Sequence, residues 1–318
     1  MDTKELFMNG AFVPVERGVI SVQTHGFAYG TGCFEGIRGY WNEQDQQIYL
    51  FRIREHFERL LRSCKVLQIS LPYTVDQLID ICVELVRRNA HQGDIYIKPL
   101  AYKADLSIGV RLHGLPDHFI ITSQPMGNYI DITGLHCGVS SWQRIDDNAI
   151  PARAKICGGY VNSALAKSEA LQNGFDEAIM LTHEGHVSEG SAANIFLLLN
   201  GELVTPAPTE NILVGVTRDT VMELARRELG RITRERQIDR TELYEADEIF
   251  LCGTGVQIAP VVRVDHRPIG DGAVGPIART IQETYFDVVR GRRPEYRAQW
   301  CTPVYTEVPA PLHSEVTN

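Results

Sequence analysis

Long apolar runs are missing from this sequence. No stretch of the 318 residues reaches the roughly 18 consecutive apolar residues that a membrane-spanning helix requires. Residues 1–6 also lack the basic and then apolar pattern of a secretory signal peptide. The sequence therefore predicts a cytoplasmic protein without a membrane partner.

Paired motifs for disulfides or metals are missing as well. The seven cysteines include no Cys-x-x-Cys pair, and their odd number and wide spacing are typical of reduced cytoplasmic thiols. The ten histidines include no His-x-x-x-His or His-x-His pattern. His183 and His186 flank Glu184-Gly185, which is typical of a turn between strands. We therefore expect neither a disulfide framework nor a metal site.

An excess of positive charge is also absent. The formal net charge is -9, which disfavours nucleic acid or an anionic membrane as the main partner. Small anions are not excluded, because they bind at local sites. A composition of 44% hydrophobic and 22% charged residues is that of an ordinary globular protein. The length suits two domains better than one core.

The hydrophobic pattern predicts a mixture of strands and helices. Asn9-Gly10 predicts a hairpin turn between two short strands. Apolar residues recur at helical spacing in both halves of the chain, and the second half contains two such segments. The expected helices are 52–67, 75–90, 160–174 and about 213–229, and the expected strands include 94–102, 118–122, 177–181, 195–199 and 247–252.

The glycine-rich stretch 29–38, Tyr-Gly-Thr-Gly-Cys-Phe-Glu-Gly-Ile-Arg, approaches a dinucleotide-binding fingerprint. Gly30, Gly32 and Gly36 are the near match, but the last spacing is one residue too long and no apolar strand precedes it. The residues that follow are typical of strand and loop, not of the helix of a βαβ unit. The stretch therefore argues against a Rossmann domain.

One lysine has an unusual local context. Lys155 follows a proline-led loop and precedes Gly158 and Gly159, and Tyr160 lies five residues after it. Glycine lets the backbone approach a flat ligand closely, and a lysine in such a place is a candidate to form a Schiff base with a carbonyl. Most lysines are exposed, so a solvated surface lysine is the ordinary alternative.

Two further segments present free backbone amides. Gly215, followed by Thr217 as the expected N-cap, begins a helix that ends before Gly230. A helix start binds phosphate through its free N–H groups and its positive dipole end, whereas a capped helix without a ligand is the alternative. The strand 247–252 ends in the residues 253–255, Gly-Thr-Gly, which again expose amides and a hydroxyl.

Together these segments resemble the branched-chain aminotransferase group of the class IV aminotransferases, which are fold type IV pyridoxal-phosphate enzymes. The resemblance extends from about Phe7 to Trp300, nearly the whole chain. Several motifs in order are more specific than any one alone. The motifs are Tyr29–Arg38, Arg153-Ala154-Lys155 with Tyr160, Ser188-Glu189-Gly190 with Asn194, Gly215–Asp219 and Gly253-Thr254.

The resemblance implies two α+β domains with pyridoxal 5′-phosphate between them. The expected boundaries are a small N-terminal domain at 1–125, an interdomain loop at 126–135, a large C-terminal domain at 136–300 and a tail at 301–318. The family also implies a homodimer or a higher homo-oligomer, whose neighbouring subunits complete the pocket walls.

Three residues receive chemical roles from the resemblance. Lys155 would hold the cofactor as a Schiff base and move the substrate proton. Glu189 would pair with the pyridine nitrogen and keep it protonated, so that the ring accepts electrons. Tyr160 would donate a hydrogen bond to the phenolic oxygen of the ring. No metal is implied.

Phosphate and substrate contacts are implied in the same way. The phosphate would be bound by Arg59, by the amides of Val216 and Thr217, and by Thr254. Helical spacing alone puts Arg59 opposite the apolar face, like exposed arginines. The implied substrate contacts are Tyr29, Phe34, Gly36, Tyr96, Lys98, Tyr129, Thr254 and Gly255.

One position departs from the family pattern. Period-two alternation places Tyr96 and Lys98 on the same face of their strand, which is either solvated or one wall of a pocket. Related enzymes often carry Tyr-x-Arg here, and that arginine takes the side-chain carboxylate of glutamate. Lysine keeps the charge but loses the bidentate fork. Recognition of glutamate and 2-oxoglutarate is therefore weaker or is provided elsewhere.

The resemblance predicts a transaminase that exchanges an amino group between branched-chain L-amino acids (leucine, isoleucine, valine) and 2-oxoglutarate by a ping-pong route. A D-amino acid or (R)-amine transaminase on the same fold is the first alternative. A nicotinamide-dependent reductase is another, although short-chain reductases place the tyrosine before the lysine, the reverse of Lys155 and Tyr160. A non-catalytic binding protein on the same fold is the last.

Overall fold

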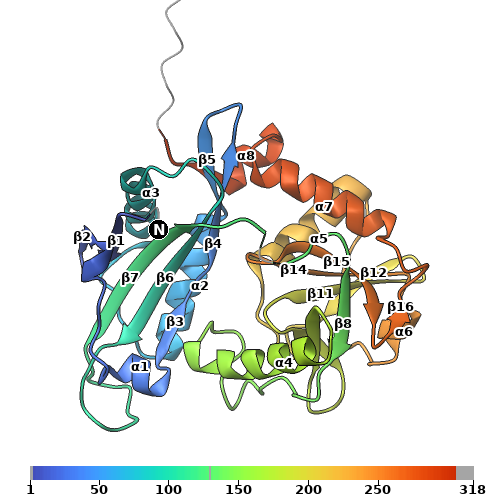
Figure 1. The fold of residues 1–318 in the computed structure, drawn as a ribbon, viewed down its shortest axis with the longest axis horizontal. Coiled ribbons are helices and arrows are strands. Elements are labelled where there is room, and N and C mark those ends of the chain that lie inside the picture. Colours follow the sequence, from blue (N-terminus) through green and yellow to red (C-terminus); the bar gives the residue numbers. More distant parts are fainter. Residues whose placement is uncertain (1–2, 129, 306–318) are drawn as a thin grey trace, which may run out of the picture.

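Strands and helices of this chain form two separate sheets with helices packed around them (Figure 1). The computed structural model describes residues 3–128 and 130–305. Across these ranges, no helix is long and apolar enough to cross a membrane. The mixture of elements confirms the expected α+β class.

The first sheet is antiparallel throughout. Its strands in the described residues are β1 (Glu5–Met8), β2 (Ala11–Pro14), β3 (Gly32–Phe34), β4 (Ile37–Asn42), β5 (Gln47–Phe51), β6 (Ile95–Lys103), β7 (Asp117–Pro125) and β17 (Cys301–Pro303). Their order is β17-β5-β4-β6-β7-β1-β2, and β3 pairs with β6. Asn9 and Gly10 connect β1 to β2 at φ 49° and 97°. Positive φ at both residues is what a type I′ hairpin turn requires, so the predicted hairpin is confirmed.

Two long helices pack on this sheet. They are α2 (Ile53–Val66) and α3 (Val75–Asn89), and both agree with the predicted helices to within about a residue at each end. Phe57 and Leu60 of α2 and Leu78 of α3 are buried in one apolar cluster with Ile97 of β6. Thr74 starts α3 in a reciprocal capping box with Gln77. The short helix α1 (His25–Tyr29) precedes β3.

The second sheet is mixed. Its strands in the described residues are β8 (Leu135–Val139), β9 (Glu177–Leu181), β10 (Val187–Gly190), β11 (Asn194–Leu199), β12 (Glu202–Pro206), β13 (Arg234–Arg236), β14 (Glu248–Gly253), β15 (Gln257–Val264) and β16 (Arg267–Pro268). Their order is β10-β9-β8-β15-β14-β11-β12-β13, with β16 beside β15. β8 runs parallel to both β9 and β15, and β13 runs parallel to β12. Every residue of the central strand β11 is buried, which explains its continuous apolar sequence.

The second half contains more helices than the pattern predicts. α4 (Tyr160–Gln172) and α5 (Val216–Leu229) match the two expected helices, whereas α6 (Glu242–Glu245), α7 (Pro276–Val289) and α8 (Pro294–Trp300) were not predicted. α7 packs on β14 and β15, and its Tyr285 is buried against Phe51 of the first sheet. The carboxylate of Glu248 accepts the amides of Ile277 and Ala278 at 3.1 and 2.8 Å and so fixes the start of α7.

The chain returns to the first sheet at its described end. Residues 301–303 form β17, which pairs with β5, and Val304 is fully buried. The backbone amide of Val304 donates to the carbonyl of Ile48 and to the side chain of Gln47. The prediction of a tail beginning at residue 301 is therefore wrong for residues 301–305, because their backbone groups are paired in the sheet.

Candidate active site

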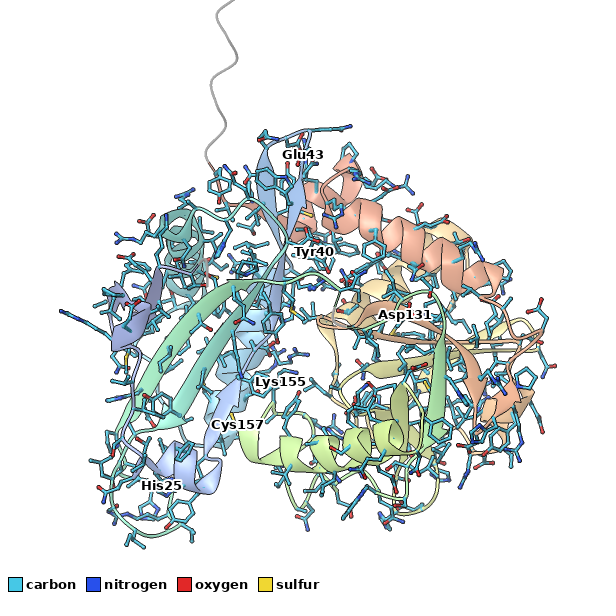
Figure 2. All side chains as sticks on the ribbon, in the orientation of Figure 1. His25, Tyr40, Glu43, Asp131, Lys155 and Cys157 are labelled. Atoms are coloured by element: carbon cyan, nitrogen blue, oxygen red, sulfur yellow. The ribbon has the colours of Figure 1, made fainter. Side chains whose placement is uncertain are left out.

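A cavity of about 520 Å³ lies between the two sheets. Figure 2 shows Lys155 at this position, between the strands of the first sheet and those of the second. Such a volume is in the usual range of small-molecule sites. The predicted site residues that line it are Phe34, Gly36, Arg59, Tyr96, Lys98, Lys155, Tyr160, Glu189, Val216, Thr217, Thr254 and Gly255.

The backbone of Lys155 is fixed by the N-terminal half of the molecule. Its amide donates to the hydroxyl of Ser63 on α2 at 3.1 Å, and its carbonyl accepts the amide of Phe34 at 3.0 Å. The side chain enters the cavity, where Nζ donates to Oη of Tyr160 at 2.6 Å. Nζ also lies 5.0 Å from the centre of the Phe34 ring. The alternative of an ordinary surface lysine is therefore wrong.

Gly158, three residues after Lys155, serves chain packing. The amide of Gly158 donates to the carbonyl of Gly30 at 3.2 Å, and a Cβ on Gly30 would lie 2.9 Å from Cα of Gly158. Gly30 has φ 66°, which glycine adopts without a steric cost. The close approach that the sequence assigned to a ligand is thus made between two backbone segments.

The carboxylate of Glu189 is buried and fully hydrogen-bonded. Oε1 forms an ion pair with Nη2 of Arg144 at 2.9 Å, and Oε2 accepts the side-chain amide of Asn194 at 2.9 Å. The backbone amide of Leu213 lies 3.3 Å from both oxygens. Burial raises the pKa of Glu189, while the charge of Arg144 and the amide of Leu213 act to lower it.

Arg59 is buried in an ion pair, contrary to what its helical position predicts. Its Nε and Nη2 donate to the two oxygens of the fully buried Glu35 at 2.7 and 2.8 Å, and Nη1 donates to the carbonyl of Val214 at 2.9 Å. Nδ1 of His56 lies 2.8 Å from the same carboxylate. Burial opposes the ionisation of Glu35, but the charge and hydrogen bonds of Arg59 outweigh it and hold the pKa of Glu35 below its ordinary value. Arg59 also lines the cavity, and a guanidinium has five N–H donors, so it keeps donors for an anion.

The start of α5 faces the same cavity. Gly215 is its N-cap, so the prediction of Thr217 as the N-cap is wrong, and Val216 and Thr217 are the first two helical residues. Their amides belong to the first turn, which has no partners within the helix. A Cβ on Gly215 would lie 2.2 Å from Oδ1 of Asn194, which explains glycine at this N-cap. Thr254 and the turn between β14 and β15 complete this wall.

Four of the eight predicted substrate residues, Phe34, Gly36, Tyr96 and Lys98, line the cavity from the first sheet. Tyr96 and Lys98 alternate with buried residues along β6, as expected, and Nζ of Lys98 lies 5.0 Å from the Phe34 ring centre. A Cβ on Gly36 would lie 2.1 Å from Oη of Tyr96, so glycine leaves room for that hydroxyl. Tyr29 is not among the lining residues of this chain.

Tyr29 lies on α1 with 40% of its surface exposed, and its Oη accepts the amide of Gly109 at 3.3 Å. Tyr129, the other predicted substrate residue, lies outside the described residues. Sequence reasoning missed Arg144, Gln124 and Met126, which also line the cavity. No local motif marks any of the three, because their roles arise from contacts between distant segments.

The chain is similar to known aminotransferases in sequence. The family model of amino-transferase class IV matches residues 32–264. A probable branched-chain-amino-acid aminotransferase of Aquifex aeolicus (strain VF5) is 47% identical over 300 residues, which are 94% of this chain and 96% of that protein.

Two solved structures share the fold. The branched-chain aminotransferase of Thermoproteus uzoniensis with norvaline superimposes with a TM-score of 0.91 at 42% identity, over 95% of this chain and 99% of its own. The branched-chain amino acid aminotransferase of Thermobaculum terrenum in its PLP-form (holo-form) gives a TM-score of 0.90 at 40% identity, over 96% of this chain and 99% of its own. These likenesses confirm the expected fold type.

Proposed function

The chain belongs to the class IV aminotransferases, and from that membership we propose that its cavity binds pyridoxal 5′-phosphate and transfers amino groups. The substrates are branched-chain L-amino acids (leucine, isoleucine, valine) and 2-oxoglutarate, in a ping-pong route. The observation that carries the proposal is the convergence of Lys155, Tyr160, Glu189 and the start of α5 on one cavity. When bound, the cofactor supplies a ring that accepts the electrons left at the substrate carbon.

The cavity fits the three reactive parts of this cofactor. A lysine amine suits its aldehyde, and a buried carboxylate suits its pyridine nitrogen. A guanidinium beside free helix-start amides suits its phosphate dianion. Arg59 supports this fit because its bond to the carbonyl of Val214 holds α2 against the segment that begins α5.

Lys155 binds the cofactor through Nζ and moves the proton at the substrate Cα. Oη of Tyr160 accepts a hydrogen bond from Nζ at 2.6 Å. With the cofactor bound, the same hydroxyl would donate to the phenolic oxygen of the ring. Glu189 keeps the ring nitrogen protonated. Arg59, the amides of Val216 and Thr217, and the hydroxyl of Thr254 bind the phosphate. Lys155, Tyr160 and Glu189 all line the same cavity.

The opposite wall binds the substrate. Phe34 and Tyr96 offer apolar surface to a branched aliphatic side chain, and the hydroxyl of Tyr96 with the amides at Thr254 and Gly255 suits a carboxylate. Lys98 supplies the positive charge for the second carboxylate of 2-oxoglutarate. The names of the relatives favour this substrate class over a D-amino acid or (R)-amine. Family membership also argues against the nicotinamide reductase and the non-catalytic binding protein.

We propose in addition that the chain forms a homodimer or a higher oligomer. An apolar surface patch, defined by Phe27, Leu106, Ile108 and Val110, is 53–96% exposed at each residue. The loop that carries three of these residues is tied to α1, because Nε2 of His25 bonds the carbonyl of Gly109 at 2.7 Å. Exposed apolar patches of this kind mark interaction sites.

Tyr29 lies on the same patch, where it would reach the cavity of a second copy. The seven cysteines are free thiols, which supports a cytoplasmic location. The N-terminal domain of this proposal corresponds to residues 1–125 and the C-terminal domain to 136–300, joined by residues 126–135.

Transfer to 2-oxoglutarate tests the function directly. The purified protein loaded with pyridoxal 5′-phosphate is expected to convert L-leucine to its keto acid, and to do so faster than D-alanine or (R)-1-phenylethylamine. Lys155→Ala is expected to lose both the yellow colour of the loaded protein and the activity. Turnover of D-alanine or the (R)-amine without turnover of L-leucine would show that the substrate assignment is wrong. A protein that stays colourless with the added cofactor would show that the cofactor assignment is wrong.

A further inference from the structure

Arg144 has none of the roles assigned so far, yet it contacts the acid at the centre of the site. It lies in the segment between β8 and α4, and its backbone amide donates to the carbonyl of Leu181 at 2.8 Å. Its side chain is held at a second point, where Nε donates to the carbonyl of Asn211 at 3.1 Å. Nη2 then reaches Oε1 of Glu189 at 2.9 Å. The guanidinium is therefore fixed in one orientation.

The surroundings of Glu189 leave it dependent on that guanidinium. Among the residues that the structure describes, Arg144 alone forms an ion pair with it, and the other two direct donors, Asn194 and Leu213, are neutral. The other titratable groups that face Glu189 are Lys155, Arg59 on α2 and Cys252 on β14.

Neither of the other cations replaces Arg144. The Arg59 charge is already matched by the bidentate pair with Glu35, and the Lys155 amine is the group that the cofactor occupies. Cys252 adds no charge of either sign, since burial raises the pKa of its thiol and keeps it protonated. A buried carboxylate without a cationic partner takes up a proton instead of remaining charged.

We infer that Arg144 is a positioning residue that keeps Glu189 ionised and aimed at the cofactor nitrogen, and thereby sets how strongly the ring is protonated. The inference rests on the proposed function. A protonated Glu189 could not hold a proton on the ring nitrogen, so loss of Arg144 would weaken the electron-accepting ring without removing any contact to the phosphate. The burial that raises the pKa of Glu189 is the force that Arg144 opposes.

The direct test uses pyridoxal 5′-phosphate labelled with ¹⁵N in the ring, because the nitrogen chemical shift reports whether the ring is protonated. In Arg144→Met the shift is expected to move toward that of an unprotonated ring. The kcat with L-leucine is expected to fall at least ~tenfold, the equivalent of about one pKa unit, while KM changes little. Arg144→Lys keeps the charge but loses the Nε contact that fixes the side chain to the carbonyl of Asn211, so a smaller move in the same direction is expected.

Two controls separate this role from others. Arg236→Met removes an arginine that has a comparable ion pair, to Glu242 at 2.6 Å, but does not line the cavity, and it should leave the shift unchanged. In a Glu189→Gln background, adding Arg144→Met should change neither the shift nor kcat further, because Arg144 acts through Glu189.

Three results overturn the inference. The first is an unchanged nitrogen shift in cofactor-loaded Arg144→Met. The second is a further loss of kcat when Arg144→Met is added to Glu189→Gln. If Arg144→Met does not fold, the third is an unchanged nitrogen shift in Arg144→Lys. A wild-type protein that does not bind the labelled cofactor would instead overturn the proposed function, so the two failures are distinguishable.

Discussion

The guanidinium of Arg59 and the carboxylate of Glu35 are buried together, and each compensates the charge of the other. Removing one partner of such a pair leaves an unpaired buried charge. Arg59→Met is therefore expected to destabilise the cofactor-free protein by about 3–5 kcal/mol. Adding Glu35→Gln to that variant should recover part of the loss, because no unpaired charge then remains. Urea unfolding followed by circular dichroism measures both values.

A matched surface variant controls for the loss of an arginine. Arg88 pairs with Glu84 on α3 with both side chains 42% exposed, and Arg88→Met should change stability by less than about 1 kcal/mol. Two results would contradict the energetic role assigned to the buried pair. One is an Arg59→Met variant that is no less stable than Arg88→Met. The other is a further loss of stability when Glu35→Gln is added to Arg59→Met.

Glu35 and His56 are both buried, and each should lower the stability of the folded protein in a different range of acidic pH. Glu35 stays ionised in the folded protein to a lower pH than in the unfolded chain, so its contribution is present above pH 4.5, its ordinary pKa, and is lost as the pH falls below that value. Burial lowers the pKa of His56 from 6.5, so protons favour the unfolded chain already below pH 6.5.

Unfolding free energy measured from about pH 7 to pH 3 tests this assignment. Wild type is expected to lose stability in both ranges, and Glu35→Gln should lose less than wild type below pH 4.5. Parallel curves for the two proteins in that lower range would contradict the assignment of Glu35 as an ionised buried group.

Residues of the site differ in how far the sequence reveals them. Lys155 and Glu189 stand in motifs, and the structure brings them to one cavity. Arg59 is predicted by resemblance alone, since helical spacing places it with exposed arginines. That spacing contains no information about the carboxylate of Glu35, 24 positions away, with which Arg59 pairs in the interior. Arg144 has no local pattern at all, because it lies in the segment between β8 and α4 and its partner Glu189 lies 45 positions away on β10. Contacts between distant segments are what a linear pattern omits.

Elements show the same division. α2 and α3 follow from apolar spacing, and β1 and β2 follow from Asn9-Gly10. α7 went unpredicted although Gly275-Pro276 is a helix-start pattern and its buried residues have helical spacing. β17 is different, because three residues pair with β5 across about 250 positions and contain no strand pattern of their own.

The start of α5 depends on the absence of one side chain. Gly215 has φ −75° and ψ 140°, which any residue adopts, so backbone strain is not the reason for glycine. A Cβ there would lie 2.2 Å from Oδ1 of Asn194, whose amide bonds both Glu189 and the carbonyl of Leu213. Gly215→Ala is expected to cost about 1–3 kcal/mol and to weaken cofactor binding, because it displaces Asn194.

Thermal unfolding and a titration with pyridoxal 5′-phosphate measure these two effects of Gly215→Ala. Gly93→Ala is the control, since no atom lies within 4 Å of a Cβ at that position and its φ is not in the left-handed region. Equal melting temperatures and equal affinities for the two alanine variants would show that Asn194 moves aside without cost.

The whole molecule is organised by its two sheets and by the segments that join them. Arg290 at the end of α7 donates to both oxygens of Asp94 at 2.9 and 2.8 Å, and β17 brings the end of the described chain back to β5. The N-terminal domain that we propose is thus held by residues from both ends of the chain. The cavity lies where the two sheets face each other, so its shape depends on this arrangement.

Association of two copies is the largest-scale consequence of the apolar patch. Ile108 is 96% exposed at the tip of a loop that Gly109 ties to α1, so its exposure is built into the fold. In a symmetric dimer each substitution acts twice, and burying one such side chain contributes roughly 1.5–3 kcal/mol. Ile108→Glu is therefore expected to shift the protein to monomers in sedimentation velocity and to lower activity. Ile232→Glu, at 81% exposure outside the patch, should sediment like wild type. A wild-type protein that is monomeric would show that the patch is not the interface. An Ile108→Glu variant that sediments as the same oligomer as wild type would show this too.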